Sequence, residues 1–174
     1  TDLIFCAPDR AFNARQATRK IPMLSVSKIV APTDFSDAAK YGFHKALEIV
    51  KHFSATVYPV HVVNPIPTIP GASAPTGFHL RTAIEEMQDN AREALNKLMG
   101  EIEADLASEP QIVTGDPGTE IARFADGIEA DIIVIASHGQ SGWARFVSGS
   151  VTEKVIRRTS TPVLVVSVPE ESSA

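Results

Sequence analysis

Short apolar runs alternate along the chain with longer segments whose apolar residues recur every three or four positions. The short runs cover residues 28–31, 56–63, 111–114, 131–136 and 162–166. They are rich in valine and isoleucine, which is typical of strands buried on both faces of a sheet. The segments between them have the spacing of amphipathic helices. The pattern therefore predicts five strands separated by helices.

Local signals indicate where the helices start. The expected starts are near Ser36, Leu80, Asp116 and Ser150. At Ser36, Asp116 and Ser150 a side-chain oxygen can accept from the free N–H groups of a first helical turn. Ser150 and Glu153 also have the spacing of a capping box. The apolar stripe from Leu80 to Leu106 predicts one long helix that packs on the core.

The alternation of strands and helices predicts a three-layer, doubly wound α/β domain with a five-stranded parallel sheet, of the Rossmann-like type. We expect this domain over residues 28–168, preceded by an arm at 1–27 and followed by a tail at 169–174. The arm is either a poorly ordered terminus or a segment that packs on a partner subunit. Residues 64–79 contain four prolines and two glycines and are expected to form a loop.

Composition narrows the range of partners. The net charge of −5 gives no reason to expect nucleic acid, which is bound through Lys and Arg. No apolar run approaches the roughly 20 residues needed to cross a bilayer, so no membrane partner is expected. Cys6 is the only cysteine, which excludes an internal disulfide and suits a reducing cytoplasm. No residue pattern predicts a metal site.

The segment after the fourth strand contains the clearest candidate chemistry. His138-Gly139 follows that strand, and Gly149-Ser150 opens the last helix. A helix N-terminus has free N–H groups and a positive dipole end, both of which favour an anion. Glycines let the backbone approach phosphate oxygens closely. Alternatively, Ser150 is only an N-cap and the glycines are only turn residues, and the pattern by itself leaves both interpretations open.

Several separated motifs, in this order, resemble those of the universal stress protein family. The matching stretches are residues 29–36, 60–63, 115–117, 132–139, 149–155 and 161–166. The resemblance covers about residues 28–168. It implies a fold of the adenine nucleotide-binding type, with ATP and Mg²⁺ as cofactors, and AMP or cyclic AMP as alternatives.

The family's nucleotide-binding branch has a loop of glycine, two residues, glycine, nine residues, glycine, then serine or threonine. Ala136 occupies the first glycine position and adds a methyl group where the ribose or phosphates would approach. The resemblance implies that the phosphates are held by Gly139, Gly149, Ser150, Val151 and Thr152, with His138 beside them. It places Pro32, Thr33 and Asp34 on the adenosine side and the backbone of Val62 at the adenine edge. Asp34 has a second interpretation, as a cap of the first helix or of its entry turn.

No catalytic residue is predicted. The chain has neither a Walker lysine motif nor a nucleophile elbow. We therefore expect an ATP-binding stress-response or signalling module with slow or no hydrolysis. A nucleotide-free interaction protein of the same fold and a slow nucleotide hydrolase are the alternatives. His61 is expected to be a hydrogen-bonded core histidine.

The last strand suggests how the protein assembles. Residues 162–166 form an apolar run that is expected at the edge of the sheet, and such edges are normally paired or covered. The family resemblance implies that this strand pairs with its twin in a homodimer.

Overall fold

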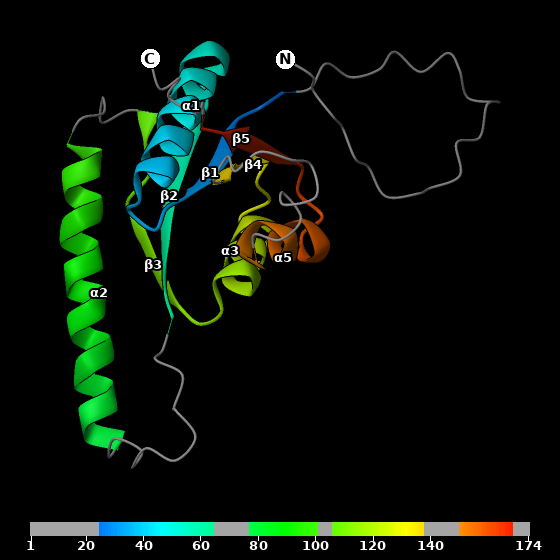
Figure 1. The fold of residues 1–174 in the computed structure, drawn as a ribbon. Coiled ribbons are helices and arrows are strands. Elements are labelled where there is room, and N and C mark those ends of the chain that lie inside the picture. Colours follow the sequence, from blue (N-terminus) through cyan, green and yellow to red (C-terminus); the bar gives the residue numbers. More distant parts are fainter. Residues whose placement is uncertain (1–24, 65–76, 101–105, 138–149, 169–174) are drawn as a thin grey trace, which may run out of the picture.

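The computed structural model describes residues 25–64, 77–100, 106–137 and 150–168. Its elements are β1 (Lys28–Pro32), α1 (Asp37–Phe53), β2 (Thr56–Val63), α2 (Gly77–Met99), β3 (Gln111–Thr114), α3 (Pro117–Gly127), β4 (Ile132–Ser137), α5 (Ser150–Arg158) and β5 (Val163–Ser167). The five strands form one sheet in the order β3-β2-β1-β4-β5, and every pairing is parallel. This arrangement confirms the predicted α/β fold (Figure 1).

Two apolar clusters, one on each face of the sheet, form the core. Ile29 and Ala31 of β1 point into the cluster beneath α1, and Val30 points into the cluster beneath α3 and α5. This alternation follows from the two-residue period of a strand. Figure 1 shows α1 on one side of the sheet and α3 with α5 on the other. The valine- and isoleucine-rich runs of the central strands β1 and β4 are therefore covered on both faces, as the sequence predicted.

The boundaries of α2 differ from the prediction. The helix begins at Gly77, inside the segment expected to be a loop, and ends at Met99 instead of continuing to Leu106. Ala107 forms a bridge with Val57, and Leu106 packs against the α1-side cluster. Leu106 therefore reaches the core from a 3₁₀ turn beyond the end of α2, although its spacing continues the helical stripe. The predicted extension of this helix to Leu106 is wrong.

Pro59 is fully buried within β2, which is a central strand. The carbonyl oxygens of Val57 and Val63 accept from residues on the β3 side. Because backbone groups alternate along a strand, those of every second residue from Val57, including Pro59, face β3. Pro59 is therefore turned toward residues 108–110, which separate the Ala107 bridge from the start of β3. Its missing N–H coincides with a break in pairing, which explains why proline is tolerated there.

Two aspartates tie elements together at the amino ends of the strands. Asp131 accepts from the backbone N–H groups of Ser27 (2.8 Å) and Lys28 (2.9 Å), and these bonds hold its pKa below the ordinary value. Burial opposes ionisation of Asp126, but hydrogen bonds from Thr159, Thr161 and Ser160 outweigh it and lower its pKa. Asp131 thus joins the starts of β1 and β4, and Asp126 joins the end of α3 to the entry of β5.

The chain ahead of β1 already contributes to the core. Val26 is buried in the α1-side cluster, and Ser27 is hydrogen-bonded to Asp131. Residues 1–24 and 169–174 lie outside the described part of the chain, so the limits of the predicted arm and tail stay predictions. Among the described helices, none is long and apolar enough to span a membrane.

Candidate functional site

The direction of winding reverses between β1 and β4. From β1 the chain proceeds outward to β2 and β3, whereas β4 lies on the other side of β1 and leads to β5. Ile29 pairs with Ile132 and Val30 with Ile133, so continuing this register brings Thr33 level with Ala136. In open parallel sheets, ligands bind beyond the carboxyl ends of the strands at such a reversal. The carboxyl ends of β1 and β4 therefore define the candidate site.

The turn that follows β1 is held by hydrogen bonds within the turn and by one to β2. The Thr33 N–H donates to the Val60 carbonyl (2.9 Å), and the Thr33 hydroxyl accepts from the Phe35 N–H (3.0 Å). The Asp34 carboxylate accepts from the Ser36 N–H (3.0 Å), and Ser36 is the N-cap of α1, as predicted. Asp34 is exposed, whereas Thr33 is 6% exposed. The entry-turn role foreseen for Asp34 is thus present, and its side chain remains at the surface of the site.

His61 contacts this turn from β2. Its Nδ1 lies 2.8 Å from the Thr33 carbonyl oxygen, and its ring stacks on Phe35 with 4.6 Å between centroids. The prediction of a hydrogen-bonded histidine is confirmed. The ring is only half-buried, however, so it lies at the edge of the candidate site and not deep within the core.

Val62 lies next to the same turn. The Val60 carbonyl faces β1, and because peptide groups alternate along a strand, that of Val62 faces the same side. β1 leaves the sheet at Pro32, opposite Val60. The backbone of Val62 is therefore directed toward the flank where Asp34 departs from the sheet.

The methyl group of Ala136 points toward α1. Val134, two residues earlier in β4, belongs to the α1-side cluster, so Ala136 faces the same layer. A Cβ placed on Gly42 of α1 would lie only 2.9 Å from the Ala136 Cβ. The additional methyl is therefore accommodated by a glycine on the facing helix. The Ala136 methyl group therefore lies on the face of the sheet opposite α5.

The first turn of α5 packs on the other face. Val151 contacts the cluster beneath α3 and α5, and Thr152 is buried. Lys154 crosses Gly118 of α3, where an added Cβ would meet the lysine Cβ at 2.6 Å, and its Nζ lies 2.9 Å from Asp116. These contacts fix the start of α5 against α3.

Asp116 caps α3, as the sequence predicted. Its carboxylate accepts from the Thr119 hydroxyl and N–H. The bond from the Thr119 hydroxyl, followed by the bond from Lys154, lowers the pKa of Asp116 to about 2. Asp116 is therefore ionised near neutral pH, and it stabilises the end of α3 that lies beside the start of α5.

The structure brings part of the predicted site together. Pro32, Thr33 and Asp34 lie around the end of β1, with Val62 and Ala136 on its two neighbouring strands. Val151 and Thr152 lie in the first turn of α5, which begins at Ser150 as predicted. His138, Gly139 and Gly149 lie outside the described residues. Within the described ranges, no group of three or more His, Cys, Asp or Glu side chains is arranged to hold a metal ion.

Sequence reasoning missed the contribution of Gly42 and the joint role of His61 and Phe35. Gly42 had no local signal, because its importance depends on Ala136, which is far away in the sequence. Phe35 has a positive φ of 65°, which is uncommon for a residue with a side chain and has no counterpart in the hydrophobic pattern.

The fold and the site geometry define a class of protein: doubly wound α/β domains with a candidate ligand site where the winding reverses. The family model described as the Universal stress protein family matches residues 25–167. The chain belongs to the universal stress protein family.

Relatives and solved structures agree with this assignment. Universal stress protein MJ0531 of Methanocaldococcus jannaschii is 37% identical over 146 residues, covering 83% of this chain and 84% of that protein. The solved structure of MJ0577, from the same organism, is 29% identical, covers 84% of this chain and 99% of its own, and superimposes with a TM-score of 0.67. A universal stress protein solved in complex with cAMP is 26% identical, with 82% and 97% coverage and a TM-score of 0.53.

Proposed function

We propose that this protein is a stress-response module that binds an adenine nucleotide, with ATP as its Mg²⁺ complex the preferred ligand, and hydrolyses it slowly or not at all. The observation that carries the proposal is the packing of Ala136 against Gly42. Ala136 replaces the first glycine of the family's loop pattern, and this contact places its methyl group on the face of the sheet opposite α5. The similar protein solved with cAMP supports an adenine nucleotide as the ligand class.

The proposed binding residues lie on both sides of the winding reversal. Pro32, Thr33, Asp34 and the backbone of Val62 would hold the adenosine part. Ser150, Val151 and Thr152 at the start of α5, together with His138, Gly139 and Gly149, would hold the phosphates, because a helix N-terminus favours anions. We propose no catalytic residue. The bound nucleotide would stabilise one conformation or partnership of the module in the reducing cytoplasm that the single cysteine favours.

Calorimetric titration with Mg-ATP, AMP and cyclic AMP tests the proposal. We expect saturable one-site binding with ATP tightest, and release of phosphate far slower than the 1–10³ s⁻¹ typical of enzymes. Gly149→Val should abolish binding of ATP, because a side chain would block approach to the phosphates. Asp89→Ala, on the exposed surface of α2, is the control and should bind like the wild type. A wild-type protein that binds none of the three would instead favour the nucleotide-free interaction protein.

We also propose a homodimer in which β5 pairs with its twin. β5 is an edge strand whose apolar residues are only partly buried, and Ile156 on the adjoining α5 is 49% exposed. The Ile133 N–H donates to the Pro162 carbonyl. Because backbone groups alternate along a strand, those of residues 162, 164 and 166 face β4, and the N–H and carbonyl of Val165 point away from the sheet edge shared with β4. Among the described strands none pairs with this outward edge, and such an edge beside apolar side chains is a template for strand pairing.

Val165→Pro tests the dimer directly. It removes an outward N–H while sparing the ladder with β4, so we expect a folded monomer in sedimentation equilibrium at micromolar concentration. Val165→Thr keeps the N–H and should remain dimeric. A wild-type protein that sediments only as a monomer would overturn the dimer and leave the nucleotide proposal standing.

A further inference from the structure

The turn between β1 and α1 contains a residue in an unfavourable backbone conformation. Phe35 has φ = 65°, in the left-handed region that L-residues with side chains adopt rarely. Such a conformation persists only where the surrounding contacts determine it. The position is central to the candidate site, because Phe35 directly follows Asp34.

Three contacts converge on this turn. The Phe35 N–H donates to the Thr33 hydroxyl (3.0 Å), the Phe35 ring stacks on His61 at an interplanar angle of 26°, and His61 Nδ1 lies 2.8 Å from the Thr33 carbonyl oxygen. A carbonyl oxygen only accepts, so Nδ1 carries the hydrogen of this bond. His61 therefore holds both ends of the turn, the Thr33 peptide by a hydrogen bond and the Phe35 side chain by stacking.

We propose that His61 is a positioning residue, which holds the β1–α1 turn in its left-handed form and thereby sets the direction of Asp34. The role is distinct from that of a core histidine, because the imidazole is half-buried and directs both its hydrogen bond and its ring stack to the turn. The consequence for ligand affinity rests on the proposed function. The turn lies on the adenosine side, so His61 would govern affinity for the nucleoside and not for the phosphates.

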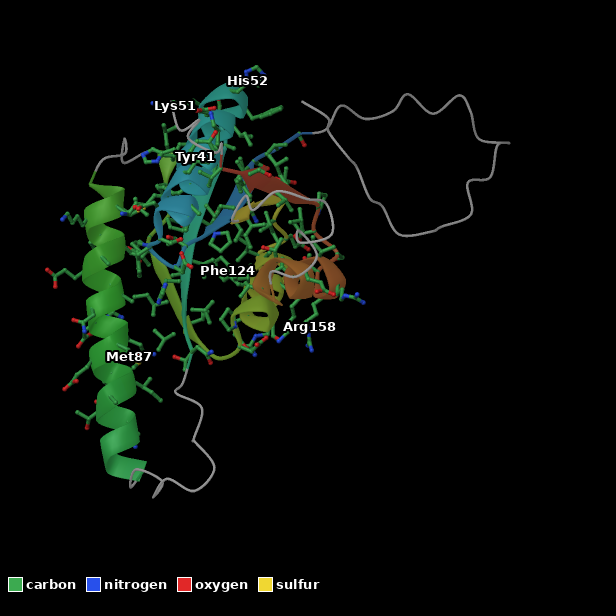
Figure 2. All side chains as sticks on the ribbon, in the orientation of Figure 1. Tyr41, Lys51, His52, Met87, Phe124 and Arg158 are labelled. Carbon is green, nitrogen blue, oxygen red and sulfur yellow. The ribbon has the colours of Figure 1, made fainter. Side chains whose placement is uncertain are left out.

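The first test uses nucleotide-free protein. In His61→Ala, we expect amide hydrogen exchange of Phe35 and Ser36 to accelerate about tenfold or more, while amides in β4 and α3 keep their wild-type rates. His61→Asn retains a donor near Nδ1, and His61→Phe retains the stack, so each should restore part of the protection. His52→Ala is the matched control, because His52 also contacts a phenylalanine, at 4.9 Å between centroids, but lies at the far end of α1 (Figure 2).

The second test measures ligand affinity. His61→Ala should lower the affinity for adenosine and for ATP by the same factor, about tenfold, because both ligands contain the nucleoside. Unchanged exchange at Phe35 and Ser36, or acceleration spread evenly over the whole domain, would overturn the proposal. Should His61→Ala fail to fold, the Asn and Phe variants decide it by the same exchange measurement. If the wild type binds neither adenosine nor ATP, the proposed function fails, while the exchange rates still decide whether His61 holds the turn.

Discussion

The two ends of the sheet use polar side chains in different ways. At the amino ends of the strands, the carboxylates of Asp131 and Asp126 accept several hydrogen bonds each from residues that enter neighbouring strands. At the carboxyl ends, the polar contacts of Thr33, Asp34 and His61 stay within or beside one turn and shape its backbone. At the amino end, carboxylates thus join the starts of different strands, whereas at the carboxyl end these polar contacts converge on a single turn.

This difference indicates a division between stability and binding. Carboxylates that are engaged by several donors of their own chain contribute to folding by satisfying those donors. A turn held in a special conformation presents its backbone and neighbouring side chains in a fixed direction, which is what a ligand site requires. We therefore expect substitutions at the amino end to lower stability without changing affinity, and substitutions that displace the β1–α1 turn or the end of β4 to change both.

The largest effect is expected at the amino end. Asp131→Ala leaves the N–H groups of Ser27 and Lys28 without their acceptor, which should lower the free energy of unfolding by about 2 kcal/mol. This corresponds to a fall of roughly 4–8 °C in Tm, measurable by calorimetry. Asp89→Ala, which removes an exposed ion pair with Arg92, should change Tm by less than about 2 °C. A loss of nucleotide affinity in Asp131→Ala would contradict the expectation that the amino end contributes to stability and not to binding.

A smaller effect is expected where β4 ends against α1. In Gly42→Ala, the new methyl would lie 2.9 Å from the Ala136 Cβ and 3.1 Å from its backbone nitrogen. Crowding costs about 1–3 kcal/mol, and the helix preference for alanine offsets up to about 1 kcal/mol. We expect a net loss of about 1 kcal/mol in chemical denaturation, together with weaker nucleotide binding because the end of β4 shifts.

A double-mutant cycle isolates this contact. Adding Ala136→Gly to Gly42→Ala should restore most of the lost stability, because one of the two methyl groups is then absent. Gly127→Ala is the control, since a Cβ there meets nothing within 4 Å. If the effects of the two substitutions were simply additive, the contact between α1 and β4 would not set the position of this strand end.

Much of the fold could be predicted because its signals are local. The β-branched runs and the N-caps Ser36 and Asp116 depend on neighbours in sequence, and the structure confirms both caps. The end of α2 at Met99 was missed because the apolar spacing continues to Leu106, which packs on the core from outside that helix. Periodicity reports which residues are apolar, and it does not report where the backbone leaves the helix.

The candidate site was less accessible to sequence reasoning. Its residues were named from a family resemblance, which placed them along the chain without their tertiary partners. The contact of Ala136 with Gly42 and that of His61 with Thr33 each join residues that are distant in sequence. No pattern within a single element contains such information. The roles of His138, Gly139 and Gly149 stay predictions.

The smallest effect is expected at Lys154, on the carboxyl side of the comparison. Lys154→Met keeps an aliphatic chain over Gly118 but removes the exposed pair with Asp116, so Tm should change by less than about 2 °C. Thr119 is the larger cause of the lowered pKa of Asp116, so that pKa should stay below its ordinary value of 3.8 in the variant.

An acid titration in which carboxyl chemical shifts are followed by NMR would measure the pKa of Asp116 in the wild type and in Lys154→Met. Because the folded pKa is lowered, the contribution of Asp116 to stability is complete above about pH 4 and is lost as the pH falls through about 2. A return of the Asp116 pKa to 3.8 in Lys154→Met would show that the lysine, and not the helix cap, controls this carboxylate. In that case the contact between α5 and α3, and not the cap within α3, would set the charge state of this carboxylate.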